Sequence, residues 1–432
     1  MPQAIGKYRW TICALIFFAT TINYLDRAVI SLLKSTLEIE FKWTETDYSN
    51  LVIAFQLAYA LGLLGVGRLI DRLGTKIGYA VSLIAWSLSA IAHAFVRSTV
   101  GFFVARAALG LSEAGNFPAA IKTVAEWFPK RERALATGIF NSGSNIGAIL
   151  APLTVPWIAQ EMGWRWAFII TGSIGLLWLL FWFWLYEIPA RQKRLGKAEY
   201  DYIHADDEVK ETDEQADTGK VPWGRLLVFK QTWAFVIGKF LTDPIWWFYL
   251  FWLPDFLKKQ YGLVGTATSL PIALVYTMSS FGSIFGGWLP FYLIRRGWPV
   301  FRARKTSMLI YAFAVIPVVF AQSLGSLNMW FAVLIIGLAA SAHQAWSANI
   351  FTTVSDMFPK KTVASVTGIG GMAGALGGIL IARLAGLLLD YYKPLGKDHV
   401  AYFIMFIICG AAYLVAWLIM HFLVPRMKRV NV

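Results

Sequence analysis

The chain has 432 residues, of which 57% are hydrophobic and 15% are charged, and its formal net charge is +14. A mean hydropathy of +0.56 is too high for a water-soluble protein of this length, so lipid is the expected solvent. The basic residues lie in short segments between apolar stretches and form no patch with interleaved polar and aromatic residues, which excludes nucleic acid as the expected partner. Cys13 and Cys409 both lie in apolar stretches, which indicates buried small side chains and no disulfide framework.

Twelve long apolar stretches follow one another along the chain. A helix that crosses a bilayer needs about 20 predominantly apolar residues. The stretches cover residues 10–33, 47–70, 76–95, 99–122, 134–159, 165–187, 231–257, 267–293, 304–322, 328–351, 364–389 and 400–424. The first continues into Asn23 and Asp26 without a small-residue cleavage site, so we expect a retained helix and not a signal peptide. The sequence therefore predicts an all-α transmembrane protein.

One long charged segment, residues 188–228, separates six of these stretches from the other six. Its composition, R-Q-K-R-L-G-K followed by D-D-E-V-K-E-T-D-E-Q-A-D, predicts a solvated linker that is partly disordered or helical. We predict an N-terminal six-helix bundle over 1–187 and a C-terminal six-helix bundle over 229–432. Lys and Arg are more numerous in the short loops on the side of the termini, which predicts that both termini and the linker are cytoplasmic.

An internal repeat relates the two halves. The segment V-A-E-W-F-P-K-R-E-R-A-L-A-T-G-I from Val124 matches V-S-D-M-F-P-K-K-T-V-A-S-V-T-G-I from Val354, an offset of 354 − 124 = 230 residues. Gly138 and Gly368 are one of the matched pairs. The repeat predicts two bundles related by pseudo-two-fold symmetry. Carriers built from such parallel repeats bind their substrate between the two halves, near the middle of the membrane.

The loop after the second stretch carries a recognisable motif. The segment G-R-L-I-D-R-L-G-T-K from Gly67 to Lys76 resembles the loop signature of the major facilitator superfamily. The resemblance implies that Asp71 and Arg72 form a latch at the cytoplasmic gate, whereas the residues alone are also compatible with an ordinary charged turn. The equivalent segment of the second half, from Gly286, lacks the Asp, so any latch there is expected to be weaker.

Within that superfamily the chain is similar to the anion:cation symporter family. The similarity lies in R-W-T-I-C-A-L-I-F-F-A-T-T-I-N-Y-L-D-R from Arg9, R-A-A-L-G-L-S-E-A-G from Arg106 and E-W-F-P-K-R-E-R from Glu126. A-H-Q-A-W-S-A-N from Ala342 and S-D-M-F-P from Ser355 resemble hexuronate carriers most closely. The resemblance implies a monomer in a bacterial inner membrane that imports a hexuronate with protons as the coupling ion and no other cofactor. Galactonate, glucarate or an aromatic carboxylate remain open as alternative anions.

Asp26 and Arg27 are adjacent charges near the middle of the first helix. An ionisable residue at such a depth costs at least about 2.5–3.5 kcal/mol, so a functional role is the first hypothesis. Adjacent helical residues point about 100° apart, so the two side chains face different neighbours. We expect Arg27 to grip a substrate carboxylate by two hydrogen bonds and Asp26 to bind a coupling proton. A structural ion pair between Asp26 and an arginine of another helix is the alternative.

Arg106 and Glu113 lie seven residues apart, and therefore on one face of the fourth helix. By resemblance, Glu113 is a second proton site, and Arg106 is expected to tune it and to contact the substrate. A purely structural role for this pair stays open. Tyr59, near the middle of the second helix, matches a family position that hydrogen-bonds the substrate, although a packing role is also compatible with it.

The second half offers mostly neutral polar groups. Applying the 230-residue offset to Glu113 leads to His343, and the same segment holds Gln344, Ser347 and Asn349. We expect His343, Gln344 and Asn349 to bind sugar hydroxyls, while a satisfied core histidine is the alternative for His343.

Two helices carry polar pairs spaced four residues apart. Lys239 and Asp243 precede Pro244, and Asn141 and Asn145 lie on the fifth helix. At this spacing the two members of each pair face the same side. Lys239 and Asn141 are predicted to contact the substrate, and a self-satisfied pair is the alternative in each case.

Two other classes of membrane protein are disfavoured. The five histidines are scattered and show no metal-ligand spacing, so neither a metal site nor a membrane-embedded enzyme is expected. A channel needs a ring or filter repeated about an axis, whereas this chain carries one asymmetric set of charges. A carrier for a small organic anion is the remaining prediction.

Overall fold

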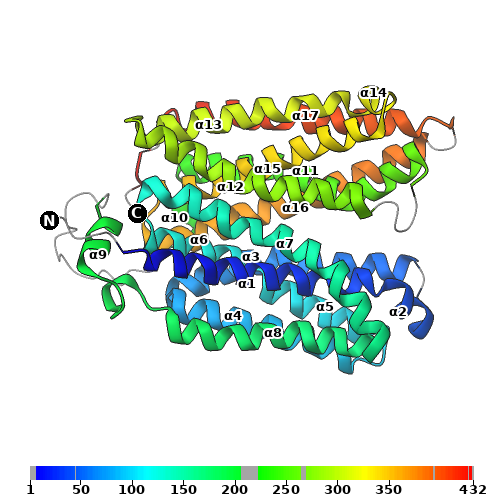
Figure 1. Ribbon diagram of the computed structural model, residues 1–432, viewed down its shortest axis with the longest axis horizontal. Coiled ribbons are helices and arrows are strands. Elements are labelled where there is room, and N and C mark those ends of the chain that lie inside the picture. The colour runs from blue at the N-terminus through cyan, green and yellow to red at the C-terminus, as the bar shows by residue number, and fades with distance from the viewer. Residues whose placement is uncertain are drawn as a thin grey trace.

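The computed structural model describes residues 6–43, 45–205, 222–263, 269–392, 395–426 and 428–430, and within these ranges it contains helices and no strand. Figure 1 shows two bundles of helices lying side by side, one built from each half of the chain, with both termini at the same end of the molecule. We call this the terminal end, and the opposite one the far end.

The first half contains α1 (Tyr8–Leu32), α2 (Lys34–Phe41), α3 (Glu45–Leu73), α4 (Thr75–Ala92), η1 (His93–Phe95), α5 (Thr99–Glu113), α6 (Asn116–Trp127), α7 (Lys130–Met162) and α8 (Trp164–Leu185). The second half contains α11 (Lys230–Tyr261), α12 (Ser269–Arg295), α13 (Val300–Val315), η4 (Ile316–Phe320), α14 (Ala321–Gly325), α15 (Met329–Met357), η5 (Lys360–Thr362), α16 (Val363–Tyr392) and α17 (Asp398–Leu423). Each of the twelve predicted stretches falls on one of these helices or on a run of consecutive ones. The predicted two-bundle fold is confirmed.

The fourth predicted span is split into α5 and α6. Gly115 lies between them, where an added Cβ would come within 2.2 Å of the Ser82 hydroxyl oxygen on α4, so only glycine fits this close approach. Pro118 lies in the first turn of α6, where a missing backbone N–H costs no hydrogen bond. The break therefore has a local cause in the sequence.

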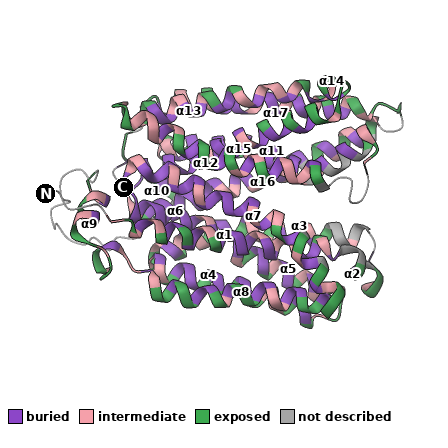
Figure 2. Cartoon of the chain, viewed as in Figure 1, coloured by how far each residue is buried: buried purple, intermediate pink, exposed green. Residues whose placement is uncertain are grey.

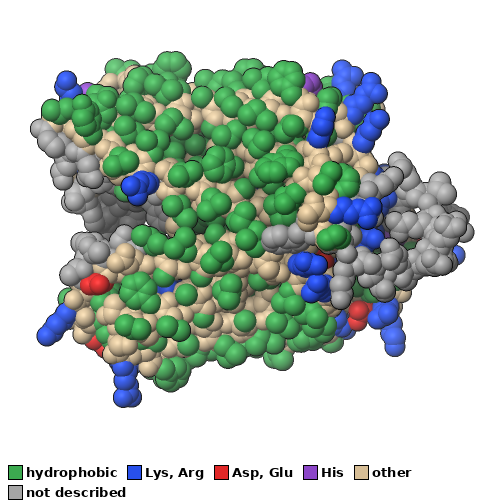
Figure 3. Space-filling view, turned by 180° about the vertical axis from the view of Figure 1, so that it is seen from behind, with side chains coloured by type: hydrophobic (Ala, Val, Ile, Leu, Met, Phe, Trp, Pro, Cys, Tyr) green, Lys and Arg blue, Asp and Glu red, His purple; other side chains and the backbone are tan. Residues whose placement is uncertain are grey.

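Nine helices of the described residues are long and apolar enough to cross a membrane. The spans outside this set are the split α5–α6 segment and the helices α7 and α11, whose buried polar residues lower their mean hydropathy. Figure 2 shows exposed residues on the outward faces of the helices and buried residues where helices meet. Figure 3 shows hydrophobic side chains over the middle of the molecule and Lys and Arg mainly toward its two ends. This distribution is that of an integral membrane protein.

Part of the predicted linker is docked against the first bundle. Its described residues include η2 (Pro189–Arg191), α9 (Lys197–Ile203) and α10 (Trp223–Leu227), whereas the acidic run lies within 206–221, outside the described residues. Glu199 of α9 is 1% exposed and accepts hydrogen bonds from the backbone N–H groups of Tyr8 and Arg9. It thereby satisfies free donors at the first turn of α1 and pairs with the Arg9 guanidinium at 2.9 Å. Pro189, Glu199, Ile203 and Leu226 are the buried residues of the described linker, and the others that can be classified are exposed or half-buried.

The most extensive contacts between the halves are those of α7 with α12 and of α3 with α16, and we call them the α7–α12 seam and the α3–α16 seam. Each contains a glycine against the backbone of the other half. An added Cβ on Gly138 would come within 2.3 Å of the Ser283 carbonyl oxygen, and one on Gly368 within 2.2 Å of the Leu63 carbonyl oxygen. These two glycines are separated by the 230-residue offset of the repeat, so equivalent positions make equivalent contacts in the two seams.

Candidate functional site

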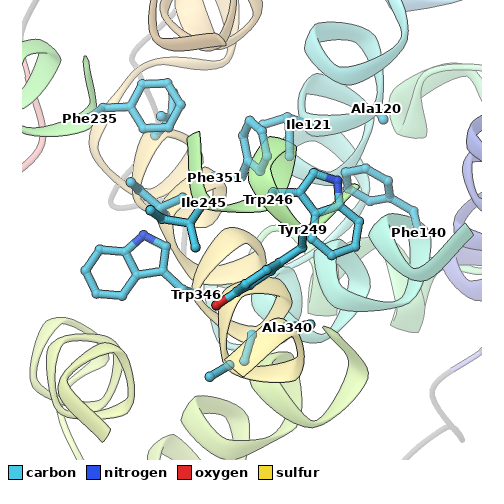
Figure 4. Close-up of a cluster of buried hydrophobic side chains, with 14 of the residues drawn as sticks. Ala120, Ile121, Phe140, Phe235, Ile245, Trp246, Tyr249, Ala340, Trp346 and Phe351 are labelled. Atoms are coloured by element: carbon cyan, nitrogen blue, oxygen red, sulfur yellow. The ribbon is translucent and has the colours of Figure 1, made fainter. Parts of the chain in front are cut away.

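A cavity lies between the two halves, and residues of both line it. Its polar lining comes from Tyr24, Arg27, Tyr59 and Asn141 of the first half and from Lys239, Asp243, His343, Gln344 and Ser347 of the second. Figure 4 shows a cluster of buried hydrophobic side chains that includes Trp246 of α11 and Phe351 of α15, two aromatic residues that also line the cavity. The cavity thus brings together charged, neutral polar and aromatic groups from both bundles.

Arg27 of α1 reaches the cavity through an aromatic cage. Its guanidinium carbon lies 4.8 Å from the ring centre of Tyr24, 5.1 Å from that of Phe55 and 4.9 Å from that of Tyr59. Its Nε donates to the Oε2 atom of Glu113 on α5 at 3.0 Å, and Glu113 is fully buried. The rings and the carboxylate fix the plane of the guanidinium, so its remaining N–H donors are oriented in advance.

Asp26 points away from the cavity and is 1% exposed. Neither of its carboxylate oxygens has a hydrogen-bond partner within the described part of the chain, and Thr171 of α8 is its polar neighbour. The expected angle of about 100° between Asp26 and Arg27 accounts for the separation. Of the two adjacent charges, Arg27 therefore forms a buried ion pair with Glu113, and Asp26 takes no part in it.

Arg106 and Glu113 are both buried on α5, and neither lines the cavity. Arg106 lies within electrostatic reach of Glu113, and its guanidinium carbon is 4.4 Å from the ring centre of Phe55. Arg27 donates a hydrogen bond to Glu113, and Arg106 lies beside this pair, outside the cavity lining.

Lys239 and Asp243 of α11 form an ion pair of 2.7 Å, and both line the cavity. The Lys239 Nζ atom also lies 4.0 Å from the ring centre of Phe351. The two side chains satisfy each other, and the substrate contact of Lys239 stays a prediction.

The neutral groups of the cavity meet across the two halves. Asn141 Nδ2 donates to Gln344 Oε1 at 2.6 Å. The Nδ1 atom of His343 is 2.6 Å from the Tyr413 hydroxyl oxygen, and the His343 ring is stacked on Trp246 with ring centres 5.2 Å apart. These side chains therefore present hydrogen-bonding edges and an aromatic surface in the same space.

Asn349, which we predicted to bind sugar hydroxyls, is not among the residues that line the cavity. Its Nδ2 donates to the carbonyl oxygens of Gly286 and Ala345, at 2.7 and 2.9 Å, and so holds α12 against α15. Five residues of helix separate it from Gln344, which turns its side chain by about 140° to another face of α15.

Asp71 joins the halves at the terminal end. Its Oδ1 accepts from Lys122 of α6 at 2.8 Å. Its Oδ2 accepts from the backbone N–H of Ser365 at 2.8 Å and from the Ser365 hydroxyl at 2.6 Å, in the first turn of α16, where backbone donors are free. Arg72 is exposed and makes none of the hydrogen bonds or ion pairs between the halves seen among the described residues, because it points about 100° away from Asp71. We call Asp71, Lys122 and Ser365 the latch; its role at a gate stays a prediction.

Sequence reasoning missed several of these residues. Tyr24 lies three residues before Arg27, so helical spacing alone could have placed both on one face. Lys122 is a lysine at the end of a predicted membrane span, which is a recognisable signal for a buried charge. Ser279, which donates to the Asn145 Oδ1 atom at 3.1 Å, carries no comparable signal because serines are common in apolar helices.

A cavity at the junction of two repeat-related helical bundles, lined by polar groups from both, is the arrangement of an alternating-access carrier. The chain matches the Major Facilitator Superfamily over residues 16–382, and it belongs to that superfamily.

Curated relatives agree with the expected resemblance. The hexuronate transporter of Escherichia coli K12 is 33% identical over 389 residues, covering 90% of this chain and 89% of the relative. The galacturonate transporter of Dickeya chrysanthemi is 34% identical over 286 residues, covering 66% of this chain and 82% of the relative. The resemblance to the family of sugar-acid carriers is thereby confirmed.

Solved structures show the same fold. The proton:xylose symporter XylE, bound to 6-bromo-6-deoxy-D-glucose, aligns with a TM-score of 0.78 at 17% identity, covering 98% of this chain and 97% of that chain. The fucose:proton symporter FucP of Escherichia coli aligns with a TM-score of 0.70 at 14% identity, covering 96% and 99%. At these identities the likeness concerns the fold alone.

Proposed function

We propose that this protein is a symporter that carries a sugar-acid anion together with protons across a bacterial inner membrane, and that a hexuronate such as glucuronate or galacturonate is its substrate. The observation that best supports this proposal is the set of side chains that line the cavity. Arg27 and Lys239 offer charged donors for a carboxylate, and Asn141, Gln344 and Ser347 offer neutral partners for hydroxyl groups. The names of the curated relatives favour the same substrate class.

In this proposal, proton coupling depends on the ion pair between Arg27 and Glu113, whose carboxylate lies behind the cavity wall. While Glu113 is ionised, its charge is matched by Arg27, so an incoming carboxylate competes with a carboxylate already bound. Protonation of Glu113 removes this competitor, and Arg27 then carries an uncompensated positive charge beside the cavity. By reciprocity, an anion that binds better to the protonated carrier also strengthens proton binding. In this proposal Asp26 is the second proton site, Tyr59 orients the substrate, and the terminal end faces the cytoplasm.

Transport by purified protein in liposomes tests this proposal. With an acidic outside, we expect glucuronate or galacturonate to accumulate against its gradient, and galactonate and glucarate serve as competing candidates in the same panel. Asp26→Asn and Glu113→Gln are expected to abolish accumulation driven by the pH difference while exchange of internal for external substrate continues. Accumulation by both variants at the wild-type level would rule out their role in coupling, and accumulation of none of the four anions by the wild type would rule out the substrate class.

A further inference from the structure

The cavity contains a second cation–carboxylate pair that the coupling scheme above does not use. Lys239 and Asp243 are held at 2.7 Å, with 5% and 18% of their side-chain surfaces exposed. Both members line the cavity, whereas in the Arg27–Glu113 pair only the arginine does. A ligand in the cavity can therefore meet the lysine and its carboxylate partner directly.

The two pairs differ in how they can be opened. Arg27 and Glu113 belong to α1 and α5, so relative movement of these helices changes their distance. Lys239 and Asp243 are one helical turn apart on α11, so rocking of the halves carries both together and leaves their separation unchanged. Rocking of the halves therefore does not open the α11 pair, whereas binding of a competing anion or protonation of Asp243 weakens it.

A substrate carboxylate at Lys239 and an ionised Asp243 would be two like charges around one ammonium group. Burying a charge without a partner costs several kcal/mol, so the arrangement with the lower free energy has one of the two carboxylates protonated. The substrate carboxylate retains the ion pair with Lys239, and Asp243 becomes neutral. Anion binding and proton uptake at Asp243 are then coupled by linkage.

The surroundings of Asp243 offer no second cation in electrostatic contact with it among the described residues. Tyrosine hydroxyls face it from α1, α3 and α17, and His343 on α15 lies near Lys239. These groups are Tyr24, Tyr59, Tyr413 and His343. From α16 the neighbour is Gly374, where an added Cβ would be 2.1 Å from the Asp243 Oδ2 atom. Arg27 lines the same cavity but is not among the charges that act on Asp243, so no positive charge beside Asp243 balances its ionised form when the substrate occupies Lys239.

We propose that Asp243 is a third proton-coupling residue: it takes up one proton from the compartment that the cavity faces when a substrate carboxylate binds Lys239, and it releases that proton together with the anion on the other side. This inference rests on the proposed symport of a sugar-acid anion. It predicts one proton more per substrate than coupling at Asp26 and Glu113 alone.

The proton-to-substrate ratio measures the proposed step. It is obtained in liposomes from the membrane potential at which net glucuronate flux reverses under fixed gradients. We expect the ratio of Asp243→Asn to be lower than the wild-type ratio by one. Glu132→Gln is the matched control, because Glu132 is a buried carboxylate paired with Arg9 at 2.7 Å and lies outside the cavity, so its ratio is expected to equal that of the wild type. An unchanged ratio in Asp243→Asn would overturn the inference.

Substrate binding to the solubilised protein gives an independent readout. Asp243→Asn mimics the protonated state of Asp243. At alkaline pH, its affinity for glucuronate is therefore expected to be higher than that of the wild type and closer to the wild-type affinity at acidic pH. The expected gain is roughly tenfold, which is the scale of one charge-assisted hydrogen bond. A merely structural role of the pair would lower affinity at every pH and would overturn the inference.

A double variant covers the case in which Asp243→Asn does not fold. Lys239→Gln combined with Asp243→Asn leaves no unpaired charge, and its ratio is also expected to fall by one. An unchanged ratio in the double variant would be equally contrary to the inference. If the wild type itself showed no proton coupling, the proposed function would fail. If the wild type were coupled and these variants kept its ratio, the proposed function would stand and only the role of Asp243 would be refuted.

Discussion

The two seams between the halves are related by the repeat, but different chemistry holds them. In the α7–α12 seam, polar side chains bond across the interface: the Ser283 hydroxyl donates to the Gly138 carbonyl oxygen at 2.8 Å, and Ser279 donates to Asn145 at 3.1 Å. In the α3–α16 seam, Gly368 packs against the backbone of Leu63, and the hydrogen bonds recorded across it between described residues are those of Asp71 at the terminal end.

Because of this difference, the free energy needed to separate the two helices differs between the seams. Parting α3 from α16 breaks one latch and then separates small apolar surfaces, which leaves no buried polar group without a partner. Parting α7 from α12 breaks the bonds of Asn141 to Ser283 and of Asn145 to Ser279, and each group left unsatisfied costs about 1–3 kcal/mol unless water or substrate replaces the bond. We infer that the α7–α12 seam is the one whose opening responds to hydroxyl groups in the cavity.

The largest expected effect is at the latch of the α3–α16 seam. Asp71→Ala leaves the Lys122 ammonium, which is 5% exposed, without its carboxylate, and loss of one partner of a buried pair costs about 3–5 kcal/mol. Thermal unfolding in detergent is expected to show this loss, and spin labels on α3 and α16 are expected to report a wider terminal end.

Two further variants test whether the latch or general stability is responsible. Adding Lys122→Met to Asp71→Ala is expected to recover the unfolding temperature but not the closed distance. Arg72→Ala, at an exposed position, is expected to leave both unchanged. If Arg72→Ala widened the terminal end as much as Asp71→Ala, the assignment of the latch to Asp71 would be wrong.

The next largest effect is expected from substitution of the glycine in each seam, which allows the two seams to be compared directly. Gly368→Val and Gly138→Val each place side-chain atoms against a backbone carbonyl of the other half, at a cost of about 1–3 kcal/mol for overpacking. Both are expected to disfavour closure at the terminal end and to slow transport by similar factors. Gly65→Val is the control on α3, because an added Cβ there meets nothing within 4 Å. Normal closure in either seam variant would contradict the packing argument.

The fold was predictable because its main determinant is local. Apolar length defined the helices, and the repeat defined the two bundles, so neither depended on knowing which residues meet. The split between α5 and α6 also has local causes in Gly115 and Pro118. The docking of α9 was missed because it depends on Glu199 meeting the first turn of α1, about 190 residues earlier in the chain.

Several residues of the site could be predicted from the sequence, but their partners could not. Arg27, Lys239, His343 and Gln344 were found because charged and polar groups in apolar helices are conspicuous, and all four line the cavity. Their partners could not be derived, because which carboxylate meets Arg27 depends on helix packing between α1 and α5. Asn349 shows the converse: its residue type suggested a ligand contact, but its angular position on α15 directs it to the Gly286 backbone.

The smallest expected effect concerns one hydrogen bond in the α7–α12 seam. Ser279→Ala removes the donor to Asn145, which is fully buried, and is expected to destabilise the closed seam by about 1 kcal/mol. Ser280→Ala is the matched control, since the Ser280 hydroxyl donates to Tyr276 of its own helix at 3.0 Å and makes no contact of this kind across the seam. Spin labels on α7 and α12 are expected to show a larger open population in Ser279→Ala than in Ser280→Ala, and saturating substrate is expected to enlarge that difference, because substrate hydroxyls stabilise the separated helices. Equal open populations in the two variants would mean that packing and not hydrogen bonding holds this seam, and the contrast between the two seams would then be lost.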